Sequence, residues 1–153
     1  MASKIAAEQE VWKFMEENKP HFATNCTIPA SILGEPLNRR HAESHGNWIY
    51  HLFKENRIML GPCPTNKIPR NQMLVSNVED IALLHVAAMS DPEINNARLQ
   101  TWGHYAHFNE FLAILRELRP QRKFMANYPE TWHLKVSTDQ AEAEGILKKW
   151  GGQ

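Results

Sequence analysis

The fold is decided by a ten-residue stretch, Val78-Glu79-Asp80-Ile81-Ala82-Leu83-Leu84-His85-Val86-Ala87. Its apolar residues recur at helical spacing, and Asn77, directly before it, is of a type favoured at helix N-caps. The first turn carries two carboxylates, which the positive end of the helix dipole stabilises. These features predict a helix over residues 78–89. Because His85 shares a face with Ile81, we expect it to be a hydrogen-bonded structural histidine.

Four further helices are predicted around this one from apolar residues at helical spacing. Pro20 and Pro120 end two of them, and Ser137 with Gln140 three residues later is a capping-box pattern. In the first helix, the expected apolar face is Ala7, Val11, Phe14 and Met15. The four helices are expected over Ala2–Asn18, around Trp48–Phe53, over Phe108–Leu118 and, after the capping box, through Ile146, Leu147 and Trp150.

Two strands are predicted between the helices. Phe22–Ile28 alternates and is rich in strand-forming residues, and Arg98–Trp102 is the second candidate. Pro29–Pro36 is expected to be a loop, and residues 59–70 must be irregular because glycine and prolines interrupt them. The alternation of helices and strands predicts a single α/β domain over residues 1–153, with two or three mostly parallel strands and covering helices.

The composition argues against several classes of protein. The chain has 153 residues with 17 basic and 17 acidic side chains, and a formal net charge of zero disfavours an electrostatic nucleic-acid binder. It has no apolar run long enough for a membrane-spanning helix, and no secretory signal is visible at its N-terminus. Cys26 and Cys63 stand in unlike contexts, so no disulfide framework is expected. A reduced, cytoplasmic protein is the expectation.

Three strings in this order resemble the extended short-chain dehydrogenase/reductases, in particular the dihydroflavonol reductase, cinnamoyl-CoA reductase and aldehyde reductase group. They are Ala2–Glu8, Ile28–Pro36 and the helix Val78–Ala87. In that family a Tyr-x-x-x-Lys motif opens a helix, and a following strand leads into a Pro-x-x-x-x-Gly-x-Pro loop at the nicotinamide. The resemblance implies a truncated Rossmann-like fold, namely the C-terminal, substrate-binding part of a reductase of small-molecule carbonyl compounds, often in secondary metabolism.

The departures from the family concern its cofactor site. Lys4 falls on the family's lysine, and counting back four places the catalytic tyrosine one residue before Met1. The glycine-rich turn that holds the pyrophosphate would lie further upstream still. We therefore expect no cofactor for this chain alone, while the family implies NADP or NAD. By resemblance, Lys4, Pro29 and Ser31 would lie against that cofactor.

Histidines and neighbouring residues are the other candidates for acid–base chemistry, since imidazole titrates near neutrality. Residues 102–108 concentrate two histidines and a tyrosine in one turn. The catalytic candidates are Lys4, His45, His104, Tyr105, His107 and Glu110. His41 and His45 are four residues apart, but no third ligand completes a familiar spacing, so no metal site is expected.

A lipophilic or aromatic carbonyl substrate would need apolar surface, which the five tryptophans can supply. The candidates for substrate contact are His41, Trp48 and Trp102.

Three functions remain open from the sequence. The chain is part of an NAD(P)-dependent reductase and needs a complementary N-terminal half, or it is a cofactor-free isomerase, cyclase or dehydratase that uses these His, Tyr and Glu residues. In the third reading it is a non-catalytic module that forms a homodimer through an unpaired sheet edge and helix face.

Overall fold

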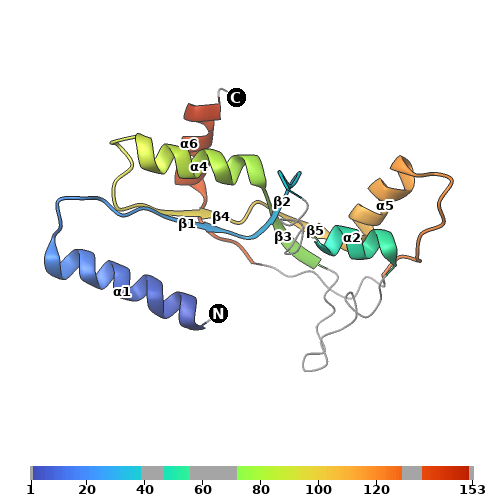
Figure 1. The fold of residues 1–153 in the computed structure, drawn as a ribbon, viewed down its shortest axis with the longest axis horizontal. Coiled ribbons are helices and arrows are strands. Elements are labelled where there is room, and N and C mark those ends of the chain that lie inside the picture. The colour runs from blue at the N-terminus through green and yellow to red at the C-terminus, as the bar shows by residue number, and fades with distance from the viewer. Residues whose placement is uncertain (1, 39–46, 56–71, 129–135, 152–153) are drawn as a thin grey trace.

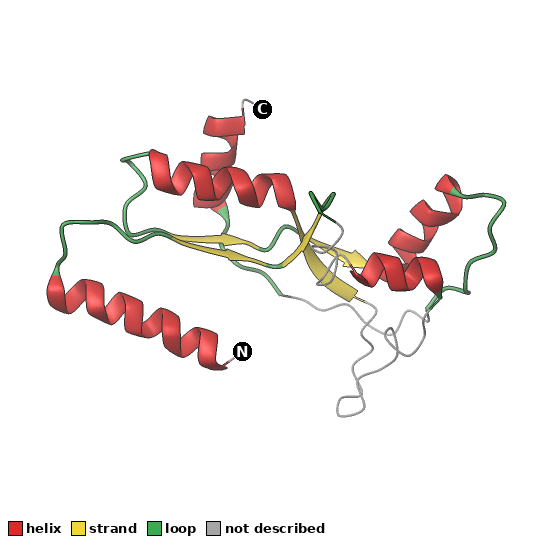
Figure 2. Ribbon diagram, viewed as in Figure 1, coloured by secondary structure: helices red, strands yellow, loops and turns green. Residues whose placement is uncertain are grey.

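The computed structural model describes residues 2–38, 47–55, 72–128 and 136–151, and these form a mixed α/β structure (Figures 1 and 2). Its helices are α1 (Ala2–Asn18), α2 (Asn47–Lys54), α4 (Val78–Ser90), α5 (Phe108–Leu118) and α6 (Ala141–Gly151). Its strands are β1 (Cys26–Pro29), β2 (Ser31–Leu33), β3 (Gln72–Asn77), β4 (Arg98–Thr101) and β5 (His104–His107). The predicted α/β class is confirmed, while the predicted irregular stretch 59–70 lies outside the described residues.

The strands form two small sheets. β1 and β4 pair in parallel, while β3 pairs in parallel with β2 and antiparallel with β5. The described residues thus contain more strands than predicted, and one of the three pairings is antiparallel. The prediction of a loop over Pro29–Pro36 was wrong in part, since β2 lies within it and pairs with β3. Sequence spacing could not show this, because the hydrogen-bond partner is more than forty residues away in the chain.

Two separate apolar clusters hold the molecule together. In the first, α4 and α6 pack on β4, and the buried residues are Leu84, Ala87, Ile94, Ala97, Leu99, Ala143 and Ile146. In the second, α2 and α5 pack against the segment that follows α5, and the buried residues are Leu52, Phe108, Leu112 and Phe124. The clusters share no residue, so the described fold has two small cores.

The helix α4 begins as predicted. The Asn77 side-chain oxygen accepts a hydrogen bond from the Glu79 backbone N–H at 3.2 Å, which satisfies one of the free donors of the first turn. His85 Nδ1 lies 2.7 Å from the carbonyl oxygen of Ile81, so the predicted hydrogen-bonded histidine is confirmed.

The helix α6 begins differently from the prediction, and the capping box at Ser137 was wrong. The helix starts at Ala141, whose N–H donates to the Asp139 carboxylate at 3.0 Å. The side-chain oxygen of Gln140 accepts from the backbone N–H groups of Trp102 and Gly103 instead. The Gln140 side chain, which the local pattern assigned to the helix cap, therefore binds the turn at Trp102 and Gly103.

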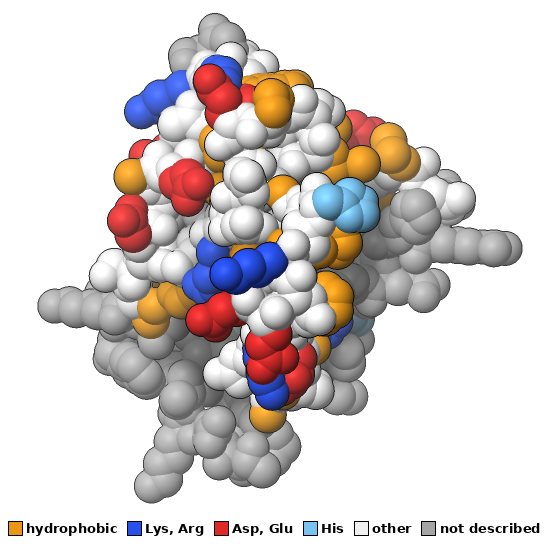
Figure 3. All heavy atoms as spheres, turned by 90° about the vertical axis from the view of Figure 1, so that its left-hand side faces the viewer, with side chains coloured by type: hydrophobic (Ala, Val, Ile, Leu, Met, Phe, Trp, Pro, Cys, Tyr) orange, Lys and Arg blue, Asp and Glu red, His pale blue; other side chains and the backbone are white. Residues whose placement is uncertain are grey.

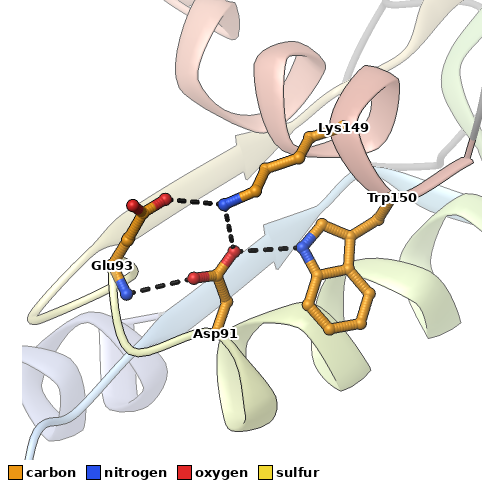
Figure 4. A network of polar contacts seen from close by, with 4 residues as sticks. All are labelled: Asp91, Glu93, Lys149 and Trp150. Carbon is orange, nitrogen blue, oxygen red and sulfur yellow. Dashed lines mark hydrogen bonds and ion pairs between the residues drawn. The ribbon is translucent and has the colours of Figure 1, made fainter.

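A polar network joins the C-terminal ends of α4 and α6 (Figure 4). Lys149 Nζ lies 2.8 Å from the buried Asp91 carboxylate and 2.6 Å from the exposed Glu93 carboxylate, and the Trp150 indole N–H donates to Asp91 at 3.1 Å. The hydrogen bond from Lys149, followed by that from Trp150, lowers the pKa of Asp91 to about 2. The same contact raises the pKa of Lys149 to about 12.

The helix α1 lies apart from the other elements and buries none of its residues (Figure 1). The Glu8 carboxylate accepts from Arg98 Nε of β4 at 2.7 Å, and this hydrogen bond is the main cause that lowers the pKa of Glu8. Of the predicted apolar face, Met15 is half-buried while Val11 and Phe14 are exposed. The helix Ala2–Asn18 is thus present as predicted, and most of its expected apolar face is exposed in the described fold.

Candidate functional site

A cleft of about 370 Å³ lies where the carboxyl ends of β3 and β4 meet the first turns of α4 and α6. In open α/β sheets, ligands bind outside the carboxyl ends of the strands. The residues that line this cleft are Val75, Ser76, Asn77, Asp80, Ile81, Thr101, Gly103, His104, Gln140, Ala143, Glu144 and Leu147. We call it the β3–β4 cleft.

The floor of the cleft is built by the turn that joins β4 to β5. Gly103 has a positive φ of 59°, and a Cβ on this residue would lie 1.7 Å from the Val75 carbonyl oxygen. Ser76 Oγ donates to the Thr101 carbonyl oxygen at 2.5 Å, which ties β3 to the same turn. Gln140 accepts from the N–H groups of Trp102 and Gly103 at 2.7 and 3.0 Å, so the start of α6 is fixed to the floor.

Polar and charged side chains come into the cleft from three elements. Asp80 lies in the first turn of α4, Glu144 in the first turn of α6, and His104 at the start of β5. Thr101 is buried with its side chain on the α4–α6 face of β4, and its hydroxyl has no hydrogen-bond partner among the described residues. A carboxylate, an imidazole and a free hydroxyl around one cavity can bind polar groups and exchange protons with them.

The structure separates the predicted acid–base group on β5. His104 and His107 are three residues apart on a strand, so their side chains point to opposite faces, and His104 lines the cleft. His107 caps α5, because its Nδ1 accepts from the Asn109 N–H at 3.0 Å while the Glu110 carboxylate accepts from the His107 N–H at 3.1 Å. Tyr105 is half-buried and pairs with Leu74 in the strand register.

The residues assigned to the cofactor by resemblance lie on two segments. Lys4 is exposed in the first turn of α1, while Pro29 ends β1 and Ser31 begins β2 beside Val75. No described contact joins Lys4 to either of the other two. The structure therefore leaves their common role as a prediction.

The two described substrate candidates, Trp48 and Trp102, lie on different elements. Trp48 of α2 packs on Phe108 in the second core, with ring centres 5.7 Å apart. Trp102 is half-buried in the turn at the cleft, next to the lining residues Thr101 and Gly103. His41 and His45 lie outside the described residues.

The N-termini of α4 and α5 are poorly suited to hold a pyrophosphate. A pyrophosphate binds at a glycine-rich turn where free N–H groups of a helix N-terminus meet no negative charge. At the start of α4, by contrast, the Asn77 side chain accepts the hydrogen bond of the Glu79 N–H group. The carboxylates of Glu79 and Asp80 in the first turn would repel a phosphate. The β5–α5 junction is closed by the capping box of His107 and Glu110.

Two classes of binding feature are absent from the described part of the chain. It holds no group of three or more His, Cys, Asp and Glu side chains that could coordinate a metal ion. None of its helices is long and apolar enough to cross a membrane.

Comparison with known proteins defines the class. No family model matches the chain. The chain is nevertheless related over nearly its whole length to reductases, and it corresponds to a C-terminal part of the extended short-chain dehydrogenase/reductases. It spans less than half the length of the curated relatives it matches.

Three relatives show how similar the chain is in sequence and how much of each relative it covers. The chain is 33% identical to aldehyde reductase 2 of Sporidiobolus salmonicolor over 98% of its own length and 42% of that protein. It is 29% identical to the NAD-dependent epimerase/dehydratase terH of Aspergillus terreus, covering 43% of that protein. It is 26% identical to an anthocyanidin reductase of Vitis vinifera, covering 44%.

Solved structures agree on the fold. The yeast methylglyoxal/isovaleraldehyde reductase Gre2, solved with NADPH, matches with a TM-score of 0.69 and 21% identity over 92% of this chain and 46% of Gre2. An engineered reductase matches with a TM-score of 0.71 over 43% of its length. The chain therefore shares the fold of the corresponding part of these reductases.

Sequence reasoning missed most of the cleft. Thr101 and Glu144 carried no distinctive motif, and Gln140 was assigned to a helix cap. Gly103 was the signal available in the sequence, since a glycine often marks a tight turn. The backbone N–H groups of such a turn need hydrogen-bond acceptors, and Gln140, just before a helix, is one.

Proposed function

We propose that this chain forms the substrate side of an NAD(P)-dependent reductase of small carbonyl compounds and that hydride transfer requires a cofactor-binding half. One observation carries the proposal: the chain aligns over 98% of its length with aldehyde reductase 2 yet covers only 42% of it. The poor fit of the N-termini of α4 and α5 to a pyrophosphate supports the need for a second half. A cytoplasmic location and a lipophilic or aromatic substrate belong to the same proposal.

The test is a fusion. The part of aldehyde reductase 2 that does not align with this chain is joined to its N-terminus, and oxidation of NADPH and NADH is followed with aliphatic and aromatic aldehydes. The fusion should oxidise one of the two nucleotides only when an aldehyde is present, and the chain alone should oxidise neither. A folded fusion with no such activity would contradict the proposal.

Lys4 offers a matched pair of variants in the fusion. By resemblance, the charge of Lys4 assists the tyrosine that protonates the carbonyl, so Lys4→Met should lower kcat by about a hundredfold. Lys13→Met removes another exposed lysine from the same helix and should leave kcat unchanged. Equal effects of the two changes would remove Lys4 from the proposed site.

A cofactor-free acid–base catalyst is the second candidate, because His104 shares one cleft with Asp80 and Glu144. Such a catalyst would exchange the protons next to a ketone carbonyl with solvent, which NMR in deuterium oxide detects. His104→Gln should then abolish exchange by the chain alone, and the exposed His21→Gln should not. The absence of exchange across a panel of ketones would exclude this candidate for that substrate class.

A further inference from the structure

The end of α5 and the turn after it form a basic surface, at the right-hand side of Figure 1. Residues 116–123 hold four cationic side chains and one acidic side chain, Glu117. The end of α2 adds one more cation. We call this surface the basic turn, and its members are Lys54, Arg116, Arg119, Arg122 and Lys123.

The backbone brings two of these arginines together. Arg119 continues the core-facing stripe of Leu112 and Leu115 by one more helical turn, so it projects from the side of α5 that packs on α2. The Arg122 N–H then donates to the Arg119 carbonyl oxygen at 3.0 Å, which closes a four-residue turn with Pro120 in its second position. The Cα atoms at the two ends of such a turn lie within about 7 Å of each other.

Arg122 is held in place by uncharged groups. Its Nη2 donates to the Phe53 carbonyl oxygen near the end of α2 at 2.8 Å. Its guanidinium carbon lies 4.2 Å from the centre of the Phe53 ring and 5.4 Å from that of Phe124. The rings and the carbonyl fix the plane of the guanidinium, and its other N–H groups have no partner among the described residues.

The other two arginines also bind neutral oxygens. Arg116 donates to the Asn127 side-chain oxygen and to the Met125 carbonyl oxygen, each at 2.7 Å. Arg119 Nη1 donates to the Leu118 carbonyl oxygen at 2.8 Å. Since no carboxylate of the described chain pairs with these arginines, their positions are fixed while their charges stay uncompensated.

The opposite end of the molecule differs in this respect. There Arg98 pairs with Glu8 and Lys149 pairs with Asp91, and Lys and Arg side chains lie next to Asp and Glu side chains on that face (Figure 3). Cations that stabilise this fold by ion pairing are thus placed beside carboxylates. The basic turn follows a different arrangement.

Helix capping accounts for only part of the charge. The C-terminal end of a helix carries about half a negative charge, which Arg119 at the end of α5 and Arg122 at the end of α2 complement. Two helix ends therefore offset about one unit charge. Arg116, Lys54 and Lys123 add positive charge for which the described residues form no ion pair.

We infer that the basic turn is a binding site for a phosphate group. Guanidinium forks match the oxygen geometry of phosphate, and several cations around one turn favour a multiply charged anion over a single carboxylate. This site is separate from the proposed function, since none of the five side chains lines the β3–β4 cleft. The phosphate belongs either to a free phosphorylated compound or to a lipid headgroup, because the neighbouring Leu118 is 60% exposed and could meet an acyl chain.

The test measures binding by the full chain to two probes. Pyrophosphate is titrated by calorimetry at low ionic strength, and sedimentation is followed with phosphatidylcholine vesicles that contain one part in five of phosphatidic acid. Binding to at least one probe is expected, and it should weaken as salt is added. Acetate at the same concentration should not compete.

Two substitutions in the basic turn identify the site. Arg119→Gln and Lys123→Gln should each raise the Kd by about tenfold. Both side chains are exposed, Arg119 bonds only its neighbouring carbonyl, and Lys123 has no described contact, so the urea midpoint should not change. Arg98→Gln is the control, because it removes an exposed arginine that Glu8 already compensates, and it should leave the Kd unchanged.

The outcomes separate the two sources. Pyrophosphate binding that the two variants weaken identifies a free phosphorylated compound. Binding to the vesicles alone, weakened by the same variants, identifies a lipid headgroup. Binding to neither probe would overturn the inference, as would equal weakening by Arg98→Gln or equal competition by acetate.

Discussion

At the residue scale, Gly103 is a position where a side chain cannot be added without moving the backbone. Its positive φ and the nearby Val75 carbonyl leave no space for a Cβ, since any added carbon meets backbone rather than a movable side chain. The turn it forms carries the chain from the β1–β4 sheet to β5, and so it positions both His104 and the N-terminus of α6.

Gly103→Ala should therefore destabilise the protein by more than about 2 kcal/mol in urea unfolding. The control is Gly145→Ala in α6, where a new Cβ meets nothing within 4 Å. That change should stabilise the protein by about 0.5–1 kcal/mol, because glycine is a poor helix former. Similar unfolding midpoints for the two variants would contradict the assigned turn.

The ionised carboxylate of Asp91 should contribute to the dependence of stability on pH in the acid range. Its pKa is lowered to about 2 in the fold, so its contribution to the free energy of unfolding is present above its ordinary pKa and is lost as the pH falls towards 2. Lys149, with its pKa raised to about 12, loses its contribution only as the pH rises through that value.

Asp91→Asn should accordingly flatten the loss of stability between about pH 4 and pH 2 in urea titrations. Glu93→Gln should flatten it less, because Glu93 is 80% exposed where Asp91 is 7% exposed, and exposed pairs are screened by solvent. An unchanged acid profile in Asp91→Asn would show that the network of Figure 4 does not form in solution.

At the scale of elements, α1 differs from the other long helices. It buries no residue and is held to β4 by the Glu8–Arg98 pair, whereas α4 buries Ile81, Leu84 and Ala87. Because most helical stability in proteins comes from packing, α1 gains less stability from the described fold than α4 does.

Hydrogen exchange should therefore be faster for the amides of α1 than for those of α4 in the chain alone. Equal protection of both helices in the chain alone would mean that α1 is packed more tightly than the structure shows.

At the scale of the whole molecule, two small hydrophobic cores stabilise the described fold. Leu84 is fully buried in the α4–α6 core and Leu112 in the α2–α5 core, and the clusters share no residue. The two cores are joined through β3, which contacts α4 and pairs with β5 ahead of α5.

Leu84→Ala and Leu112→Ala should each cost about 2–5 kcal/mol, because each leaves a cavity in a closed core. Their effects should add in the double variant to within about 0.5 kcal/mol, as is usual for sites without shared neighbours. Chemical denaturation of the four proteins in the cycle checks this. Coupling above about 1 kcal/mol would show one continuous core.

The sequence by itself determined the helices and the α/β class. The helix at 78–89 and its Asn77 cap, and the helix Phe108–Leu118, follow from contacts within one or two turns, which a local pattern records. The similarity to reductases was likewise readable from short strings in order.

Only the tertiary structure decided which side chains meet. Two contacts depend on partners tens of residues away in the chain: the pairing of β2 with β3, and the hydrogen bonds of Gln140 to the Gly103 turn. His104 and His107 are separated because side chains alternate between the two faces of the strand β5.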